Sequence, residues 1–274
     1  MIRWFIGMLL TITAVYLLVV VAAALFQRRL IYFPTVLSPA VAERRATEKG
    51  LAPWRNSQAQ LIGWKLPSSG QHVANVLIVH GNAGSAVDRD YFARPIHDAA
   101  PVDVYILEYP GYGMRGGSPS MTSLLEAADE AFRFLPTHEP VYIVGESLGS
   151  GVATHLAQAQ PNRVAGLALF MPYDSLVSVA KSAMPFLPVS LVLRERFTPA
   201  AWLADYRGPL KVVLAGNDHV IPSRFGQRLF DSYAGPKELQ VFPGAGHNDV
   251  ADQSATWWKT VFAFWERNSA RSRR

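Results

Sequence analysis

A buried strand that runs directly into Gly-x-Ser-x-Gly and then into a helix is the feature that most constrains this chain. Residues 141–144 are apolar or aromatic. Ser147 follows them, flanked by Gly145 and Gly149. A serine in this setting occupies a sharp, strained strand-to-helix turn that exposes its hydroxyl at the top of an α/β sheet. We therefore expect Ser147 to be a nucleophile; the alternative is an ordinary glycine-rich turn with a solvated serine.

Short apolar runs alternate with helical patterns over most of the remaining chain. The expected strands are 60–66, 74–79, 102–109, 141–144, 164–170, 210–215 and 239–242. The expected helices are 88–100, 122–135, 148–160, 222–233 and 255–267. This alternation predicts βαβ units, and hence an α/β fold whose mostly parallel sheet carries helices on both faces. The first strand alternates enough for the edge of the sheet, and ligands are expected beyond the carboxyl ends of the strands.

The N-terminal region contains an apolar run long enough to cross a membrane. Residues 4–26 are 23 residues without a charge. A helix of that length spans about 34 Å, which exceeds a hydrocarbon core of about 30 Å. We expect an uncleaved single-pass transmembrane anchor; the alternatives are a cleaved signal peptide and a buried core helix. Arginines flank the run on both sides, so the charge pattern leaves the side of the membrane open.

The pattern divides the rest of the chain into three parts. Residues 27–58, punctuated by prolines, are expected to form a linker and juxtamembrane segment. Residues 59–267 are expected to fold as one domain. Within it, the apolar, proline-rich stretch 171–208 interrupts the alternation and is interpreted as a small helical cap over the site, the alternative being a plain connecting excursion. Residues 268–274 are expected to be a basic tail.

Composition excludes several classes of site. The net charge is +5, and much of it lies near the two ends, which suits anionic lipid better than a nucleic-acid stripe, although a solvated tail is an equal alternative. The chain has no cysteine, which excludes disulfides, thiolate catalysis and cysteine-based metal sites. It also has no dinucleotide fingerprint after a strand, no phosphate-binding P-loop and no His-Glu-x-x-His, so no cofactor or metal is implied.

A serine hydroxyl needs a base, normally a histidine, and three histidines follow Ser147. His155 lies two turns into the helix after Ser147 and should point away from it. His219 directly follows Asp218 at a strand end. This does not leave the usual order of an acid followed later in the chain by the histidine, so His219 is interpreted as a solvated loop residue. His247 lies in the glycine-rich loop 243–249 after the last strand. A loop there can deliver an imidazole to the sheet edge, so we expect His247 to be the base.

The base needs a carboxylate that orients it. Asp218 follows the strand 210–215 and precedes His247, in the order that this type of fold requires. We expect Asp218 to hold the tautomer of His247. Asp174 is the alternative, although it is also suited to capping a helix.

A tetrahedral intermediate needs hydrogen-bond donors aimed at its oxyanion. We expect one donor to be the backbone N–H of Leu148 and the other to come from the glycine-rich loop 80–85, with Asn82 as the donor. His80 is expected to pack within that loop rather than to titrate in catalysis. Glu146 is interpreted as a carboxylate favoured by the start of a helix, the alternative being a residue that tunes the site.

Several motifs together carry a family resemblance. They are residues 30–34, 80–85, 108–113, 117–120, 145–149, 216–218, 220–222 and 246–249. The chain resembles, over nearly its whole length, the membrane-anchored alpha/beta-hydrolases related to the fungal bud-emergence protein and its animal abhydrolase-domain relatives. The resemblance implies an alpha/beta-hydrolase fold, a triad of Ser147, Asp218 and His247, and no cofactor. The chain departs from the family at 114–115 and at His219, which affects the rim of the site.

These features together predict a membrane-anchored serine hydrolase that cleaves an ester, thioester or amide through an acyl-enzyme. A small-molecule ester or acylated substrate is expected, with esterase or lipid-ester activity preferred, and no nucleic acid. The alternatives are a serine peptidase of the same fold and a non-catalytic membrane-bound interaction protein. The sequence indicates no oligomeric state.

Overall fold

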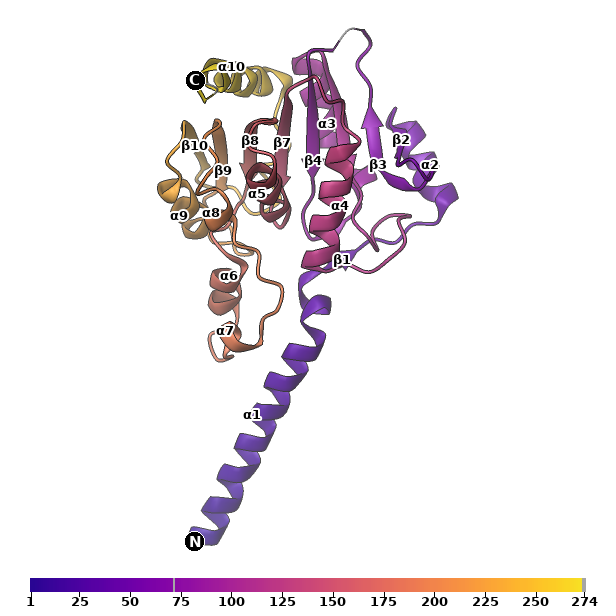
Figure 1. Ribbon diagram of the computed structural model, residues 1–274. Helices are drawn as coiled ribbons and strands as arrows, with labels where there is room; N and C mark the ends of the chain where they lie inside the picture. The colour runs from indigo at the N-terminus through magenta and orange to yellow at the C-terminus, as the bar shows by residue number, and fades with distance from the viewer. Residues whose placement is uncertain (71, 273–274) are drawn as a thin grey trace.

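The computed structural model describes residues 1–70 and 72–272, and at its centre lies an eight-stranded sheet (Figure 1). The strands lie in the spatial order β10-β9-β8-β7-β4-β6-β3-β2. Their bounds are β2 (Ala52–Arg55), β3 (Leu61–Leu66), β4 (Ala74–Val79), β6 (Val102–Leu107), β7 (Val141–Glu146), β8 (Val164–Phe170), β9 (Leu210–Ala215) and β10 (Lys237–Phe242). Two short strands, β1 (Phe33–Pro34) and β5 (Ala83–Gly84), pair separately.

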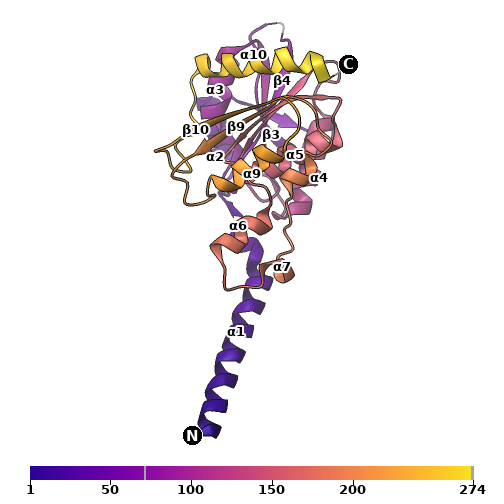
Figure 2. The same cartoon turned by 90° about the vertical axis from the view of Figure 1, so that its left-hand side faces the viewer.

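The sheet is mostly parallel and is covered on both faces. The helices are α1 (Ile2–Ile31), α2 (Pro39–Glu48), α3 (Asp90–Ala99), α4 (Met121–Arg133), α5 (Gly149–Ala159), α6 (Leu176–Ala183), α7 (Val189–Val192), α8 (Pro199–Trp202), α9 (Arg224–Ser232) and α10 (Ala255–Ser272). Neighbouring strands from β10 to β6 are parallel, whereas β3 is antiparallel to both β6 and β2. Helices α4, α5 and α9 pack on one face, and α2, α3 and α10 on the other (Figure 2). The predicted α/β fold is confirmed.

The segment 27–58 differs from the predicted linker, because most of it is built into the domain. It completes α1 and then forms α2 and β2, and β2 takes the edge of the sheet that was predicted for β3. Trp54 is only 7% exposed, and its ring lies 4.7 Å from that of Tyr105. Ala42 and Ala46, one helical turn apart, are buried against the domain. These apolar residues give the segment a buried face. The prolines in the segment had led to the prediction of a linker.

Helix α1 extends away from the sheet as one continuous element (Figure 1). Its most apolar 18-residue window has a mean hydropathy of 2.6, and none of that window is buried. By length and composition the helix is able to cross a membrane. It is not a core helix of the domain, which contradicts the alternative of a buried core helix for the apolar run 4–26.

The proline-rich stretch 171–208 folds into three short helices. Helix α8 packs against α5. Helices α6 and α7 instead leave the sheet and lie beside the C-terminal part of α1 in both views (Figures 1 and 2). Proline residues break this stretch into short pieces because proline lacks an N–H donor.

The predicted basic tail differs from the structure in its first part. Helix α10 continues to Ser272, past the predicted end at Arg267. Ser269 donates to the carbonyl of Ala165 at 2.8 Å, which ties this end of α10 to the sheet. Residues 273–274 lie outside the described residues.

Trp54→Ala tests whether β2 belongs to the core. Removing a buried tryptophan leaves a cavity against Tyr105 and should lower the free energy of unfolding by about 3 kcal/mol. The measurement is urea unfolding of the full chain in detergent, followed by intrinsic fluorescence. Gln58→Ala, an exposed change in the following turn, should stay within about 0.5 kcal/mol of the wild type. Equal stability of the two variants would contradict the assignment.

Candidate active site

Ser147 lies on a strained turn between β7 and α5. Its φ is +51°, a conformation that residues with a Cβ rarely adopt. Its N–H donates to the carbonyl of Phe170 at 2.8 Å, which fixes the turn. A Cβ at Gly149 would lie 2.1 Å from the carbonyl oxygen of Val79, so only glycine fits where α5 passes the end of β4. The glycine of the Gly-x-Ser-x-Gly motif that follows the serine is therefore required by the close approach of helix and strand.

Ser147, His247 and Asp218 form one hydrogen-bonded chain. His247 Nε2 lies 3.0 Å from Ser147 Oγ, and His247 Nδ1 lies 2.6 Å from Asp218 Oδ2. A carboxylate only accepts hydrogen bonds, so Nδ1 carries the proton and Nε2 is left to accept from the serine hydroxyl. The other oxygen of Asp218 accepts from the N–H groups of Val220 and Ile221 at 2.8 and 2.7 Å, which fixes the carboxylate.

The topology of the sheet brings these three side chains together. Ser147 follows β7, Asp218 follows β9 and His247 follows β10. Strands β7 to β10 are neighbours and run parallel, so their carboxyl ends meet at one edge.

The alternative residues lie elsewhere or are engaged. His155 Nε2, on α5, lies 3.0 Å from Asp129 Oδ1, on α4. His219 is exposed. Asp174 accepts from the N–H of Ser175 and from Arg228 Nε, each at 2.8 Å, so it stabilises the start of α6.

Two backbone N–H groups near the serine have no protein acceptor. Within residues 1–70 and 72–272, neither the N–H of Asn82 nor that of Leu148 donates to another group. The side chain of Asn82 is not free, because its amide donates to the carbonyl of Ile31 at 2.9 Å. The N–H of Asn82, rather than its side chain, is therefore the group that remains for a ligand oxygen.

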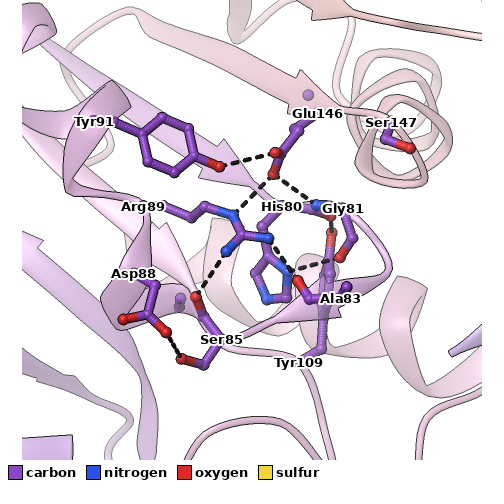
Figure 3. Close-up of polar contacts among 12 residues, drawn as sticks. His80, Gly81, Ala83, Ser85, Asp88, Arg89, Tyr91, Tyr109, Glu146 and Ser147 are labelled. Carbon is purple, nitrogen blue, oxygen red and sulfur yellow. Dashed lines mark hydrogen bonds and ion pairs between the residues drawn. The ribbon is translucent and has the colours of Figure 1, made fainter. Parts of the chain in front are cut away.

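Glu146 joins the loop 80–85 to the turn that carries Ser147 (Figure 3). Its Oε2 accepts from the N–H of Gly81 at 3.0 Å and from Arg89 Nε at 2.8 Å, and its Oε1 accepts from the hydroxyl of Tyr91 at 2.8 Å. Arg89 in turn donates to the carbonyl of Ala83 at 2.6 Å. The interpretation of Glu146 as a helix-start carboxylate is therefore wrong, because its oxygens are used across the sheet edge. No local pattern pairs residues 89 and 146.

An apolar cavity of about 200 Å³ lies beside the serine. Ser147, Leu148 and Asn82 belong to its lining. The rest comes mainly from apolar side chains of α1, α6 and α7, so the N-terminal helix contributes directly to the pocket. Within residues 1–70 and 72–272, no group of three histidine, aspartate or glutamate side chains is arranged to hold a metal ion.

Comparison with known proteins identifies the family. The family model Hydrolase_4, described as serine aminopeptidase S33, matches residues 70–205. An uncharacterized protein of Mycobacterium tuberculosis is 34% identical over 230 residues, which are 81% of this chain and 81% of that protein. The chain belongs to the alpha/beta-hydrolase family.

Further similarities agree with this family. The lysophosphatidylserine lipase ABHD12 of Danio rerio is 28% identical to this hydrolase over 210 residues, which cover 68% of this chain and 54% of that protein. Among solved structures, the esterase Pf2001 of Pyrococcus furiosus has a TM-score of 0.64 at 15% identity, covering 87% of this chain and 100% of that chain. The predicted family and fold are confirmed, and the protein is a serine hydrolase.

Beneath the loop of this hydrolase lies a buried acid–base pair, His80 and Glu108. His80 Nε2 lies 3.8 Å from Glu108 Oε1, and that oxygen accepts from the N–H of Ala86 at 2.9 Å. Burial raises the pKa of Glu108 to about 7. Burial, followed by the positive charge of Arg89, lowers the pKa of His80 well below its usual value. Both shifts favour neutral side chains, which agrees with a packing role for His80.

Glu108→Gln should remove a pH dependence of stability. The pKa of Glu108 is raised in the folded state from 4.5 to about 7, so its stabilising contribution is complete below pH 4.5 and is lost as pH rises through 7. The stability of the variant relative to wild type should therefore increase by roughly 1–3 kcal/mol between pH 5 and pH 8. Urea unfolding at both pH values measures it. His80 is present in both proteins, so a pH-independent difference would contradict the raised pKa.

Proposed function

We propose that this serine hydrolase is a membrane-anchored esterase that cleaves acyl esters through the triad of Ser147, His247 and Asp218. The hydrogen-bonded chain from Asp218 Oδ2 through His247 to Ser147 Oγ, with distances of 2.6 and 3.0 Å, carries the proposal. Its side chains are those of a serine nucleophile, a base and the carboxylate that orients the base.

The reaction follows from these positions. His247 Nε2 takes the proton of Ser147 Oγ, which attacks the ester carbonyl carbon. The N–H groups of Leu148 and Asn82 donate to the oxyanion that forms. His247 then gives its proton to the leaving alcohol as the ester C–O bond breaks. A water molecule, deprotonated by the same imidazole, attacks the carbonyl carbon of the acyl-enzyme. The bond to Ser147 Oγ breaks, His247 returns the proton to that oxygen, and the acid is released.

The lining of the pocket favours an acyl substrate. The polar side chains among its lining residues are Gln27, Asn82, Ser147 and Tyr173, and none is a carboxylate. The matching family model is described as a serine aminopeptidase. A peptidase that acts at a free amino terminus needs a negative charge to pair with that group, and no carboxylate lines this pocket. The apolar walls instead suit the hydrocarbon of an ester. The lipase named among the relatives supports lipid-like esters as substrates.

Helix α1 serves as the proposed membrane anchor. Its charge-free run 4–26 is long enough to span a bilayer. Arg28 and Arg29 follow at the interface. A signal peptide that is cleaved away would remove part of the pocket wall, which supports retention of the helix.

The decisive experiment labels the full chain with a fluorophosphonate and measures hydrolysis of short-chain esters. Ser147→Ala should abolish labelling and lower kcat by roughly 10⁶-fold. Asp218→Asn should lower kcat by about 10⁴-fold because His247 loses its correct tautomer. His155→Ala and Asp174→Asn are matched controls that should retain labelling and turnover. Equal labelling of Ser147→Ala and wild type would overturn the proposal. An absence of both labelling and hydrolysis in the wild type would favour a non-catalytic interaction protein, whereas labelling without ester hydrolysis would favour the peptidase.

A further inference from the structure

We propose that the tip of the cap, residues 184–192, lies within the bilayer beside α1, and that a single acyl chain enters the pocket sideways from the lipid. This inference rests on the proposed function, because it takes α1 as a membrane anchor and the pocket as an acyl site. It adds a second lipid-inserted element and a route for the substrate.

The cap is fastened to α1 by polar contacts near the end of the helix. Gln27 is only 7% exposed. Its amide nitrogen donates to the carbonyl of Val192 at 3.2 Å, and its oxygen accepts from the N–H of Arg194 at 2.7 Å. A buried amide with partners on both its oxygen and its nitrogen fixes the position of the cap relative to the helix.

Glu195 forms a second fastening. It is 3% exposed and accepts from Arg28 Nε at 2.9 Å and from the hydroxyl of Tyr32 at 2.5 Å. It also accepts from the N–H of Met121, at the start of α4. One carboxylate therefore joins the anchor, the cap and the domain, so the cap follows the position of α1.

The contact between the tip and α1 sets the depth of the tip. The hydroxyl of Tyr16 donates to the carbonyl of Phe186 at 3.0 Å. Tyr16 lies ten residues before Phe26, the last residue of the charge-free run, which is about 15 Å along a helix. That distance is about half of a hydrocarbon core of about 30 Å. If the run 4–26 spans the bilayer, the tip reaches into the hydrocarbon with it.

The tip is apolar except for Ser190, a composition that is compatible with lipid. Residues 184–192 carry no charge and include two prolines, which have no N–H to satisfy. The N–H groups of Leu187, Leu191 and Val192 donate within the tip. Phe186 and Leu191 are 64% and 84% exposed. These two side chains would be unfavourably placed in water but not in lipid.

The pocket follows the seam between α1 and the tip. Ala23 and Leu30 of α1 form one wall, and Leu187 and Val192 of the tip belong to the opposite one. An apolar cavity of about 150 Å³ accommodates benzene, so the 200 Å³ here holds about eight carbon atoms. A longer chain must continue along the seam toward the lipid. The ester of a single-chain amphiphile would then lie at Ser147, and a second chain would not fit.

The position of the tip is measured by single-cysteine labelling, because the chain has no native cysteine. Leu191→Cys in the full chain is labelled with an environment-sensitive fluorophore and placed in phosphatidylcholine nanodiscs that contain doxyl-labelled lipid. Leu17→Cys on α1 is the positive control. Val241→Cys on β10, which is 45% exposed, is the negative control. We expect the doxyl lipid to quench residue 191 as well as residue 17, and to leave residue 241 unquenched.

The controls separate the two proposals. Quenching at residue 17 with none at residue 191 would overturn the insertion of the tip while leaving the anchor intact. An absence of quenching at both positions would overturn the anchor, and this inference with it.

The acyl route is tested by substitutions on opposite sides of α1. Ala23→Trp fills the seam and should lower the ratio of kcat/KM for a dodecanoyl ester to that for an acetyl ester by at least about tenfold. Leu25→Trp is the matched control, since Leu25 is 69% exposed and does not line the pocket; it should leave the ratio unchanged. An unchanged ratio in Ala23→Trp would overturn the route. A wild-type protein that cleaves neither ester would instead overturn the proposed function.

Discussion

The close passage of α5 across the end of β4 is the constraint on which the site depends. At Gly149 there is no room for a Cβ, and Ser147 is held at a positive φ. This geometry places the serine hydroxyl at the sheet edge and brings the loop after β4 beside it. Glu146 and Arg89 then fasten that loop through charge-assisted hydrogen bonds within a largely buried site. The strained backbone conformation of Ser147 is thus held in place by the surrounding hydrogen bonds.

The parallel sheet then supplies the other members of the site. Adjacent strands β7, β8, β9 and β10 end at one edge, so loops separated by many residues in sequence meet there. Asp218 is fixed by two N–H groups of its own turn, and His247 is fixed by Asp218. Hydrogen bonds therefore hold both side chains in one orientation, although each residue lies in a loop.

Helix α1 is both a candidate membrane span and a wall of the pocket. Its exposed part carries the apolar surface, whereas its last turns contact the cap through Gln27 and Arg28. A helix used only to tether a domain would not need a buried glutamine or a shared carboxylate. The hydrogen bonds of Gln27 and Arg28 to the cap couple the position of the pocket to that of the candidate membrane span.

The sequence by itself determined the α/β alternation, the strained serine turn and the candidate residues Ser147, Asp218 and His247. These features depend on local periodicity, on the small size of glycine and on the order of residues at strand ends, all of which are readable along the chain. Only the tertiary structure decided that residues 39–55 belong to the domain, that Glu146 binds Arg89, and that α1 lines the pocket. Each of these contacts joins segments far apart in sequence, and a pairwise contact of that kind leaves no periodic signal in one chain.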